Sequence, residues 1–224
     1  MWGSGPRSAL LIHGLGSNKE GWWRVGPWLA DLGWTVDAVD LIGHGGAPKS
    51  DRYRIDDFVG ALPEGGWDLV LGHSLGGAIA LRAGIAPLLV LEDPLLGPLR
   101  REAVMPDFDL PPGPEAQVAA HPSWHPEDAR IKATALAQCG PGVVSAIVDD
   151  LADLDLGDEV AGLTTHTLVL GADHDPLVPV ALGEALASGN PAVTFEVVPD
   201  SSHSIHRDAF DAFTGAIEGW LARR

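Results

Sequence analysis

Six short runs of Val, Leu and Ile constrain the fold of this chain of 224 residues more than any other feature of its sequence. Their apolar residues do not alternate with polar ones, which is typical of strands covered on both faces by helices. Longer helical patterns separate the runs, at Glu20–Leu32, Leu75–Ala86 and Arg207–Arg223. This rhythm predicts an α/β fold with a mostly parallel sheet of about six strands flanked by helices. The expected strands are Ser8–His13, Thr35–Leu41, Asp68–Gly72, Leu88–Leu91, Thr167–Gly171 and Val193–Val198.

The rhythm is interrupted between residues 95 and 162. Prolines are frequent in Pro94–Pro114, and two helical stretches follow, Pro126–Gln138 and Gly142–Leu154, with no strand candidate among them. We therefore expect one domain over residues 1–224, with a small helical lid inserted at residues 95–162. The alternative is a surface decoration that has no role in substrate binding.

The charge and the cysteine content exclude several classes of partner and site. Asp and Glu total 31 against 14 Lys and Arg, a formal net charge of −17, which argues against nucleic acid or an anionic membrane surface as partner. Cys139 is the single cysteine, so an internal disulfide or a Cys-based zinc site is excluded. The first residues do not read as a signal peptide, and no apolar run reaches the roughly 18 residues of a membrane helix. The expectation is a soluble cytoplasmic protein.

The sharpest chemical signal is Gly72-His73-Ser74-Leu75-Gly76, a G-x-S-x-G sequence between an expected strand and an expected helix. A nucleophile on such a tight turn has unfavourable backbone angles, and flanking glycines leave room for the turn. The turn raises the serine hydroxyl above the sheet and puts the Leu75 amide at a helix N-terminus, where it can stabilise an oxyanion.

Three further segments follow other expected strands. They are His13–Gly16, Ala172–Pro179 and Ser202–His206. A serine nucleophile needs a base, and histidine is the usual one. Because the carboxyl ends of parallel strands meet at one edge of the sheet, these segments are expected to lie near Ser74.

Together these segments resemble the α/β-hydrolase superfamily, specifically its esterase and lactonase-like members with a modest cap. The resemblance covers most of the chain except the lid. It implies a Ser-Asp-His catalytic triad of Ser74 as nucleophile, Asp175 as acid and His203 as base, with the amides of Leu15 and Leu75 as oxyanion hole. The matching segments are HGLG (13–16), DLIGHG (40–45), GHSLGG (72–77), DPLVP (175–179) and SHSIH (202–206).

Two departures from the family pattern are visible. Family members usually have two strands before the HG loop, whereas seven residues precede Ser8 here, so the expected sheet lacks the usual antiparallel edge strand. The histidine segment also reads Ser-Ser-His, where Gly-His is commoner.

Several assignments stay open at this point. Asp173 or Asp93 is an alternative acid, since each follows an expected strand. His206 is expected to cap or pack a helix rather than abstract a proton. His73 is expected to be structural, and His44 to fix its loop by a hydrogen bond.

The lid helices suggest residues that touch the substrate. Trp124 begins a lid helix and is expected to contact substrate, and Trp23 is expected to border the cleft; packing within a core is the alternative for each. His121 and His125 are four residues apart without a third ligand, so no metal site is expected, and no cofactor is implied.

The sequence predicts a serine hydrolase that cleaves a small-molecule carboxylic ester or lactone through an acyl-enzyme. Serine rather than aspartate at position 74 argues against haloalkane dehalogenase or epoxide hydrolase chemistry. The same triad could serve amides, thioesters or carbon–carbon bonds, and a protein of this fold could instead be a ligand receptor with little turnover. The substrate and the oligomeric state do not follow from the sequence.

Overall fold

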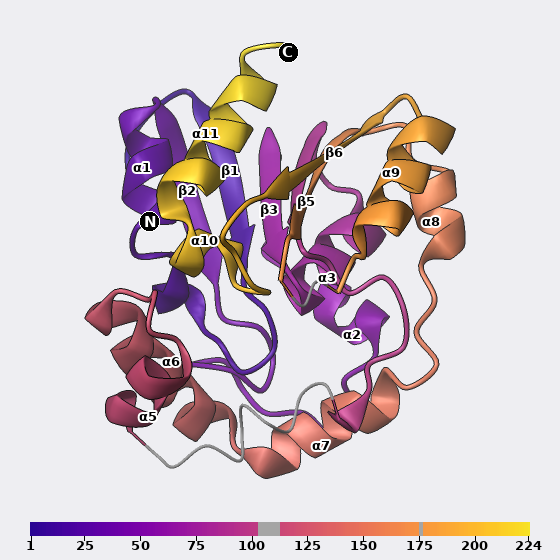
Figure 1. The fold of residues 1–224 in the computed structure, drawn as a ribbon. Coiled ribbons are helices and arrows are strands. Elements are labelled where there is room, and N and C mark those ends of the chain that lie inside the picture. Colours follow the sequence, from indigo (N-terminus) through magenta and orange to yellow (C-terminus); the bar gives the residue numbers. More distant parts are fainter. Residues whose placement is uncertain (103–112, 175–176) are drawn as a thin grey trace.

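The computed structural model describes residues 1–102, 113–174 and 177–224. Its centre is a sheet of six strands, in the order β2-β1-β3-β4-β5-β6, in which every neighbouring pair is parallel (Figure 1). The predicted fold class is confirmed, and each strand lies within two residues of its expected bounds. The strands are β1 (Arg7–Ile12), β2 (Trp34–Val39), β3 (Leu69–His73), β4 (Leu88–Glu92), β5 (His166–Ala172) and β6 (Val193–Val198).

Helices cover both faces of the sheet, which explains why the strands are apolar throughout. On one face, Leu11 and Leu71 pack against α1 (Val25–Asp31) and α11 (Phe210–Leu221). The other face packs against α3 (Leu75–Ala83). The remaining described helices are η1 (Lys19–Trp22), α2 (Ile55–Gly60), α5 (Pro114–Ala120), α6 (Pro126–Cys139), α7 (Pro141–Asp150), α8 (Gly157–Ala161), α9 (Val180–Gly189) and α10 (Ile205–Asp208).

Two expected helices are divided. Glu20–Leu32 forms η1 and α1, because Pro27 has no N–H for residue 23 and its ring would clash with that carbonyl in a continuous helix. The expected C-terminal helix is divided into α10 and α11 at Ala209, whose backbone has φ −133° and ψ 56°. Helices α2, α5, α8 and α9 were not predicted; all four are short, and α9 is apolar without a clear helical period.

The outer edge of β2 carries a single antiparallel bridge. Trp2 donates its N–H to the Val36 carbonyl at 2.9 Å and accepts the Val36 N–H at 2.8 Å. The Trp2 ring also lies against Gly26 of α1, where an added Cβ would be 2.4 Å from it.

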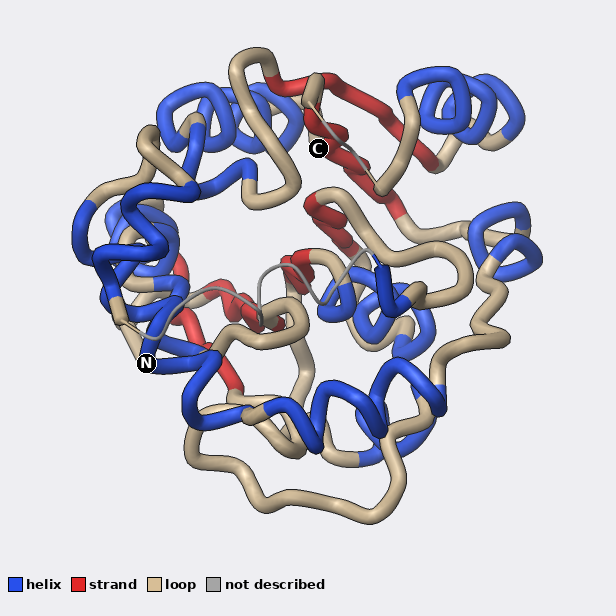
Figure 2. Tube along the Cα trace, turned by 60° about the horizontal axis from the view of Figure 1, so that its bottom comes forward, coloured by secondary structure: helices blue, strands red, loops and turns tan. Residues whose placement is uncertain are grey.

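Residues 113–162, which hold α5, α6, α7 and α8 in the connection between β4 and β5, are here called the insertion. Its helices α6 and α7 lie where the two helical stretches were expected. Figure 2 brings this end of the molecule forward, with helices around the periphery and the strands inside.

Among the described residues no single helix is long and apolar enough to cross a bilayer; α6 and α7 reach that length and composition only as a pair bent by 77°.

Candidate active site

Ser74 occupies a strained turn between β3 and α3. Its backbone angles are φ 54° and ψ −117°, a region that residues with a side chain rarely adopt. The turn is held from both sides: the Ser74 N–H donates to the Glu92 carbonyl at 2.9 Å, and its carbonyl accepts the Leu95 N–H at 3.0 Å. The strain is therefore fixed by hydrogen bonds to the end of β4.

The glycines around Ser74 are required by close backbone contacts. A Cβ on Gly72 would lie 2.3 Å from the Gly76 carbonyl oxygen, and one on Gly76 would lie 2.1 Å from the Ile12 oxygen. Across the pocket, a Cβ on Gly14 would lie 3.0 Å from the Ser74 Cβ. The HGLG loop after β1 thus packs directly against the serine, as the sequence led us to expect.

The structure brings His203 and Asp93 together. His203 lies in the loop after β6, and its Nδ1 is 2.6 Å from Asp93 Oδ2. Asp93 follows β4 with a positive φ of 37° and is fully buried. Its carboxylate also accepts the N–H groups of Leu177 and Val178, each at 3.0 Å. These three donors fix the carboxylate, and the carboxylate fixes the imidazole ring.

Asp175, the acid that the family resemblance implies, lies outside the described residues, whereas Asp93 contacts His203. The carboxylate against His203 Nδ1 comes from the end of β4. The described part of its loop supplies backbone amides to Asp93 instead of a carboxylate to His203. Asp173, the other alternative, accepts the N–H groups of Asp200 and Ser201 at 3.0 and 2.9 Å, which lowers the pKa of its carboxyl group.

Ser74 and His203 line one pocket of about 840 Å³, here called the Ser74 pocket. Leu15 and Leu75 line it as well, so the two residues expected to supply the oxyanion hole lie beside the serine. Leu75 is the first residue of α3, where backbone N–H groups have no partner within the helix. Insertion residues close the pocket, namely Ala120, His121, Pro122, Ser123 and Lys132.

His73 and His206 are held in structural contacts, as expected. His73 Nε2 donates to the His203 carbonyl at 2.9 Å. His206 Nδ1 lies 2.8 Å from Glu92 Oε1, which also accepts the His206 N–H at 2.9 Å. Burial lowers the pKa of both histidines well below the usual value and raises the pKa of Glu92. His73 ends β3 and Glu92 ends β4, so these buried contacts hold the segment around His203 against two strands.

Two further buried histidines shape the loops below the pocket. His13 Nδ1 donates to the Gly14 carbonyl at 2.8 Å, and its Nε2 accepts the Leu41 N–H at 3.1 Å. His44 Nδ1 donates to the Ile42 carbonyl at 3.0 Å. Burial lowers the pKa of His13 to about 3 and that of His44 to about 4, so both are neutral. His44 therefore holds its own loop, the role that the sequence suggested.

Neither tryptophan expected to touch substrate belongs to the described lining of the Ser74 pocket. Trp124 is buried between the insertion and α10, with its Nε1 donating to Asp208 Oδ1 at 3.0 Å. Trp23 donates its Nε1 to Asp128 Oδ1 at 2.9 Å. These contacts are those of the packing alternative, since each indole N–H has a carboxylate acceptor, the half-buried Asp208 for Trp124 and the buried Asp128 for Trp23. His121, which stacks on Trp124, does line the pocket.

Within the described ranges, no group of three or more His, Cys, Asp or Glu side chains could hold a metal ion. The groups that converge at the Ser74 pocket are instead a hydroxyl, an imidazole on a carboxylate, and backbone amides. Such a set can carry out nucleophilic acyl transfer.

Comparison with known proteins agrees with this arrangement. Residues 9–216 match the model of the "Alpha/beta hydrolase family". The chain is 34% identical to lipase LipV of Mycobacterium tuberculosis over 163 residues, 66% of this chain and 58% of LipV. It is 27% identical to a pimeloyl-[acyl-carrier protein] methyl ester esterase of Methylococcus capsulatus, over 90% of this chain and 89% of that protein.

Among solved structures, an N-formylmaleamic acid deformylase from Pseudomonas putida superposes with a TM-score of 0.81 at 26% identity, over 97% of this chain and 93% of that one. Other mycobacterial relatives match over a shorter segment, and the chain spans 25% of their length. Three findings agree: the family model covers most of the chain, the fold is shared, and the relatives include a lipase and an esterase. The chain belongs to the alpha/beta hydrolase family.

Proposed function

We propose that this protein is a serine hydrolase that cleaves a small carboxylic ester, with Ser74, His203 and Asp93 as its triad. One observation carries the proposal. The imidazole of His203 is held by Asp93 at 2.6 Å and lines the same pocket as Ser74, whose backbone is strained. Lipase and esterase relatives support an ester as the substrate class.

In this mechanism the Ser74 hydroxyl oxygen attacks the carbonyl carbon while His203 Nε2 takes the hydroxyl proton. Asp93 accepts the Nδ1–H of His203, which leaves Nε2 as the free base and stabilises the imidazolium that forms. The Leu15 and Leu75 amides donate to the oxyanion. His203 then protonates the leaving group, and a water deprotonated by the same imidazole releases the acid from Ser74.

The pocket walls support a substrate with an apolar part. Leucines from four separate segments line the Ser74 pocket, and its polar groups come both from the His203 loop and from the connection between β4 and β5. Burial of an alkyl or aryl group against these leucines would contribute binding free energy, since the gain follows apolar area. A lactone would fit the same chemistry. The leucines are Leu15, Leu75, Leu95, Leu99 and Leu177.

Hydrolysis of an amide is the second candidate. The observation that favours it is the 26% identity with a deformylase over nearly the whole chain. The two candidates differ in the leaving group, because an amine needs protonation by His203 before it departs whereas a phenolate does not.

The test is labelling with a fluorophosphonate followed by turnover assays on p-nitrophenyl esters, aryl esters, lactones and N-formyl amides. We expect labelling at Ser74 and faster turnover of esters than of amides. Labelling and turnover should both be lost in Ser74→Ala and in His203→Ala. Labelling and turnover that persist in a folded Ser74→Ala protein would overturn the proposal.

A further inference from the structure

One carboxylate beside the candidate active site joins two distant parts of the chain. Asp208, the last residue of α10, accepts hydrogen bonds from Ser123 Oγ at 2.6 Å and Trp124 Nε1 at 3.0 Å through its Oδ1. Its Oδ2 accepts the Ser202 N–H at 3.1 Å and the Ser202 Oγ at 2.6 Å. One oxygen thus binds the insertion, and the other binds the residue before His203.

These four donors match the capacity of a carboxylate, which offers about four lone-pair sites. Hydrogen bonds to an ionised acceptor are shorter and stronger than neutral ones. Two of the four contacts are 2.6 Å long. Asp208 is therefore fixed on both sides, and a shift of either segment would break a strong contact.

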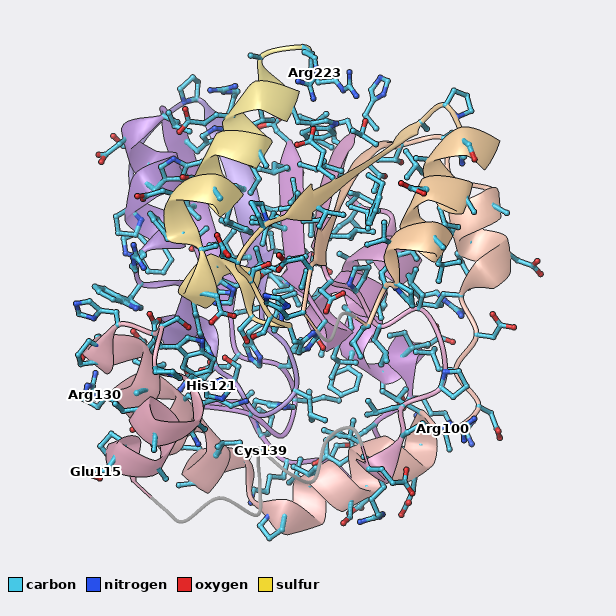
Figure 3. The ribbon with its side chains drawn as sticks, viewed as in Figure 1. Arg100, Glu115, His121, Arg130, Cys139 and Arg223 are labelled. Carbon is cyan, nitrogen blue, oxygen red and sulfur yellow. The ribbon has the colours of Figure 1, made fainter. Side chains whose placement is uncertain are left out.

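The two segments that Asp208 joins are neighbouring parts of the Ser74 pocket wall, which Asp208 itself also lines. Ser202 and His203 line it from the loop after β6, and His121 and Ser123 line it from the insertion. His121 stacks on Trp124, with ring centroids 3.9 Å apart and planes 8° apart. Figure 3 labels His121 where the insertion meets the sheet domain. The Asp208 contact to Trp124 thus extends through this stack to the pocket wall.

Two other anchors of the His203 loop lie within the sheet domain. Asp173 binds the N–H groups of Asp200 and Ser201, and Glu92 binds the N–H of His206. Arg207 reaches the insertion, with its Nε 4.0 Å from Asp128 Oδ1 and its guanidinium 4.7 Å from the centroid of the Trp124 ring. Asp208 differs from these anchors because the same carboxylate binds both the insertion and Ser202, the residue before His203.

We propose that Asp208 is a positioning residue, whose carboxylate makes the insertion part of the support that holds His203 beside Ser74. The inference rests on the proposed serine-hydrolase function. It assigns to the insertion a role in the rate of the chemical step, in addition to covering the pocket. A misplacement of about 1 Å in a catalytic group can lower a rate about a hundredfold.

The test measures how fast Ser74 reacts with diisopropyl fluorophosphate, a small probe that needs His203 as base. Ser74 Oγ bonds to phosphorus, fluoride leaves, and His203 takes the serine proton, so the rate reports on the base more than on binding. We expect Asp208→Ala to lower the second-order rate constant about tenfold to a hundredfold in folded protein. Asp211→Ala is the matched control, because this exposed carboxylate lies three residues further on and its side chain holds neither segment.

Variants on the two sides of Asp208 separate positioning from general stability. Ser202→Ala removes a donor from the histidine side, and Trp124→Phe removes one from the insertion side while keeping the aromatic ring. If Asp208 couples the two sides, each variant slows phosphonylation and the double variant loses less than the product of the two effects. These variants also decide the question if Asp208→Ala does not fold.

Wild-type rate constants in folded Asp208→Ala, or in both side variants, would overturn the inference even if the melting temperature falls. Failure of the proposed function would be visible separately, because wild-type protein would then not react at Ser74 at all. In that case Ser74→Ala would remove no labelling.

Discussion

At the scale of single residues, the structure adds most to the sequence at the proposed acid. Asp93 receives three donors, one of them the His203 Nδ1–H. Asp93→Asn replaces the carboxylate with an amide, which cannot accept all three hydrogen bonds. It favours the imidazole tautomer with the proton on Nε2, which cannot act as base toward Ser74. We expect kcat/KM for a p-nitrophenyl ester to fall by about 10³–10⁴-fold, as in other triads.

Asp175→Asn is the comparison for that prediction, and we expect it to retain most of the wild-type activity. If instead Asp175→Asn is the damaging change and Asp93→Asn is nearly silent, then His203 uses the acid that the family resemblance implied.

The two histidines that follow β6 should separate activity from stability. His203→Ala should remove ester turnover at a smaller cost in unfolding free energy than His206→Ala, since this side chain is 37% exposed and Asp93 keeps its two backbone N–H donors. His206→Ala should keep a measurable rate but cost about 2 kcal/mol, because it leaves the fully buried Glu92 with one partner fewer. Urea unfolding and ester assays on both variants check this, and a reversed order would contradict the assignment of His203.

At the scale of elements, the packing of α3 against β1 depends on glycine. A Cβ on Gly76 would lie 2.1 Å from the Ile12 carbonyl oxygen, and neither backbone can move without separating the helix from the sheet. We expect Gly76→Ala to destabilise the protein by about 3 kcal/mol, as overpacked core sites do.

Gly215 in α11 is the matched control. No other part of the described structure lies within 4 Å of a Cβ added there. Gly215→Ala should therefore stabilise the protein by about 0.5–1 kcal/mol, since alanine restricts the unfolded chain more than glycine does. If the melting temperatures of the two variants shift in the same direction, the close contact between Gly76 and the Ile12 carbonyl does not exclude a side chain at position 76.

At the scale of the whole molecule, buried neutral histidines make stability depend on pH. Burial lowers the pKa of His13 to about 3 and that of His44 to about 4. The unfolded chain therefore binds protons that the folded one does not, so stability is full above the ordinary histidine pKa of about 6.5 and falls below it. Between pH 7 and pH 5 each of these residues should cost about 2 kcal/mol.

Urea unfolding at pH 7, 6 and 5 measures this loss. His44→Gln can keep a side-chain donor to the Ile42 carbonyl and cannot titrate, so its stability should fall less steeply over the same range. If the unfolding free energy of His44→Gln falls with pH as steeply as that of the wild type, His44 does not contribute to the pH dependence of stability.

The sequence by itself determined the sheet, because six buried strands need apolar residues on both faces and leave a clear pattern. It also determined the position of Ser74, since only glycines fit the backbone contacts around that turn. Among the histidines, the place of His203 after the last expected strand indicated it as the candidate base. Each of these features is local in the chain and depends on a few neighbouring residues.

The tertiary structure decided the rest. Asp93 and Asp175 both follow expected strands, so their local sequences alone do not decide between them; the contact of 2.6 Å between Asp93 and His203 is the reason we propose Asp93. Trp124 reads as a cleft residue until Asp208, 84 residues away, is seen to accept its indole N–H. Burial turns His13 and His44 into neutral loop supports. Contacts between distant segments set such roles, because hydrogen-bond partners and burial are properties of the folded chain and leave little trace in the sequence around one residue.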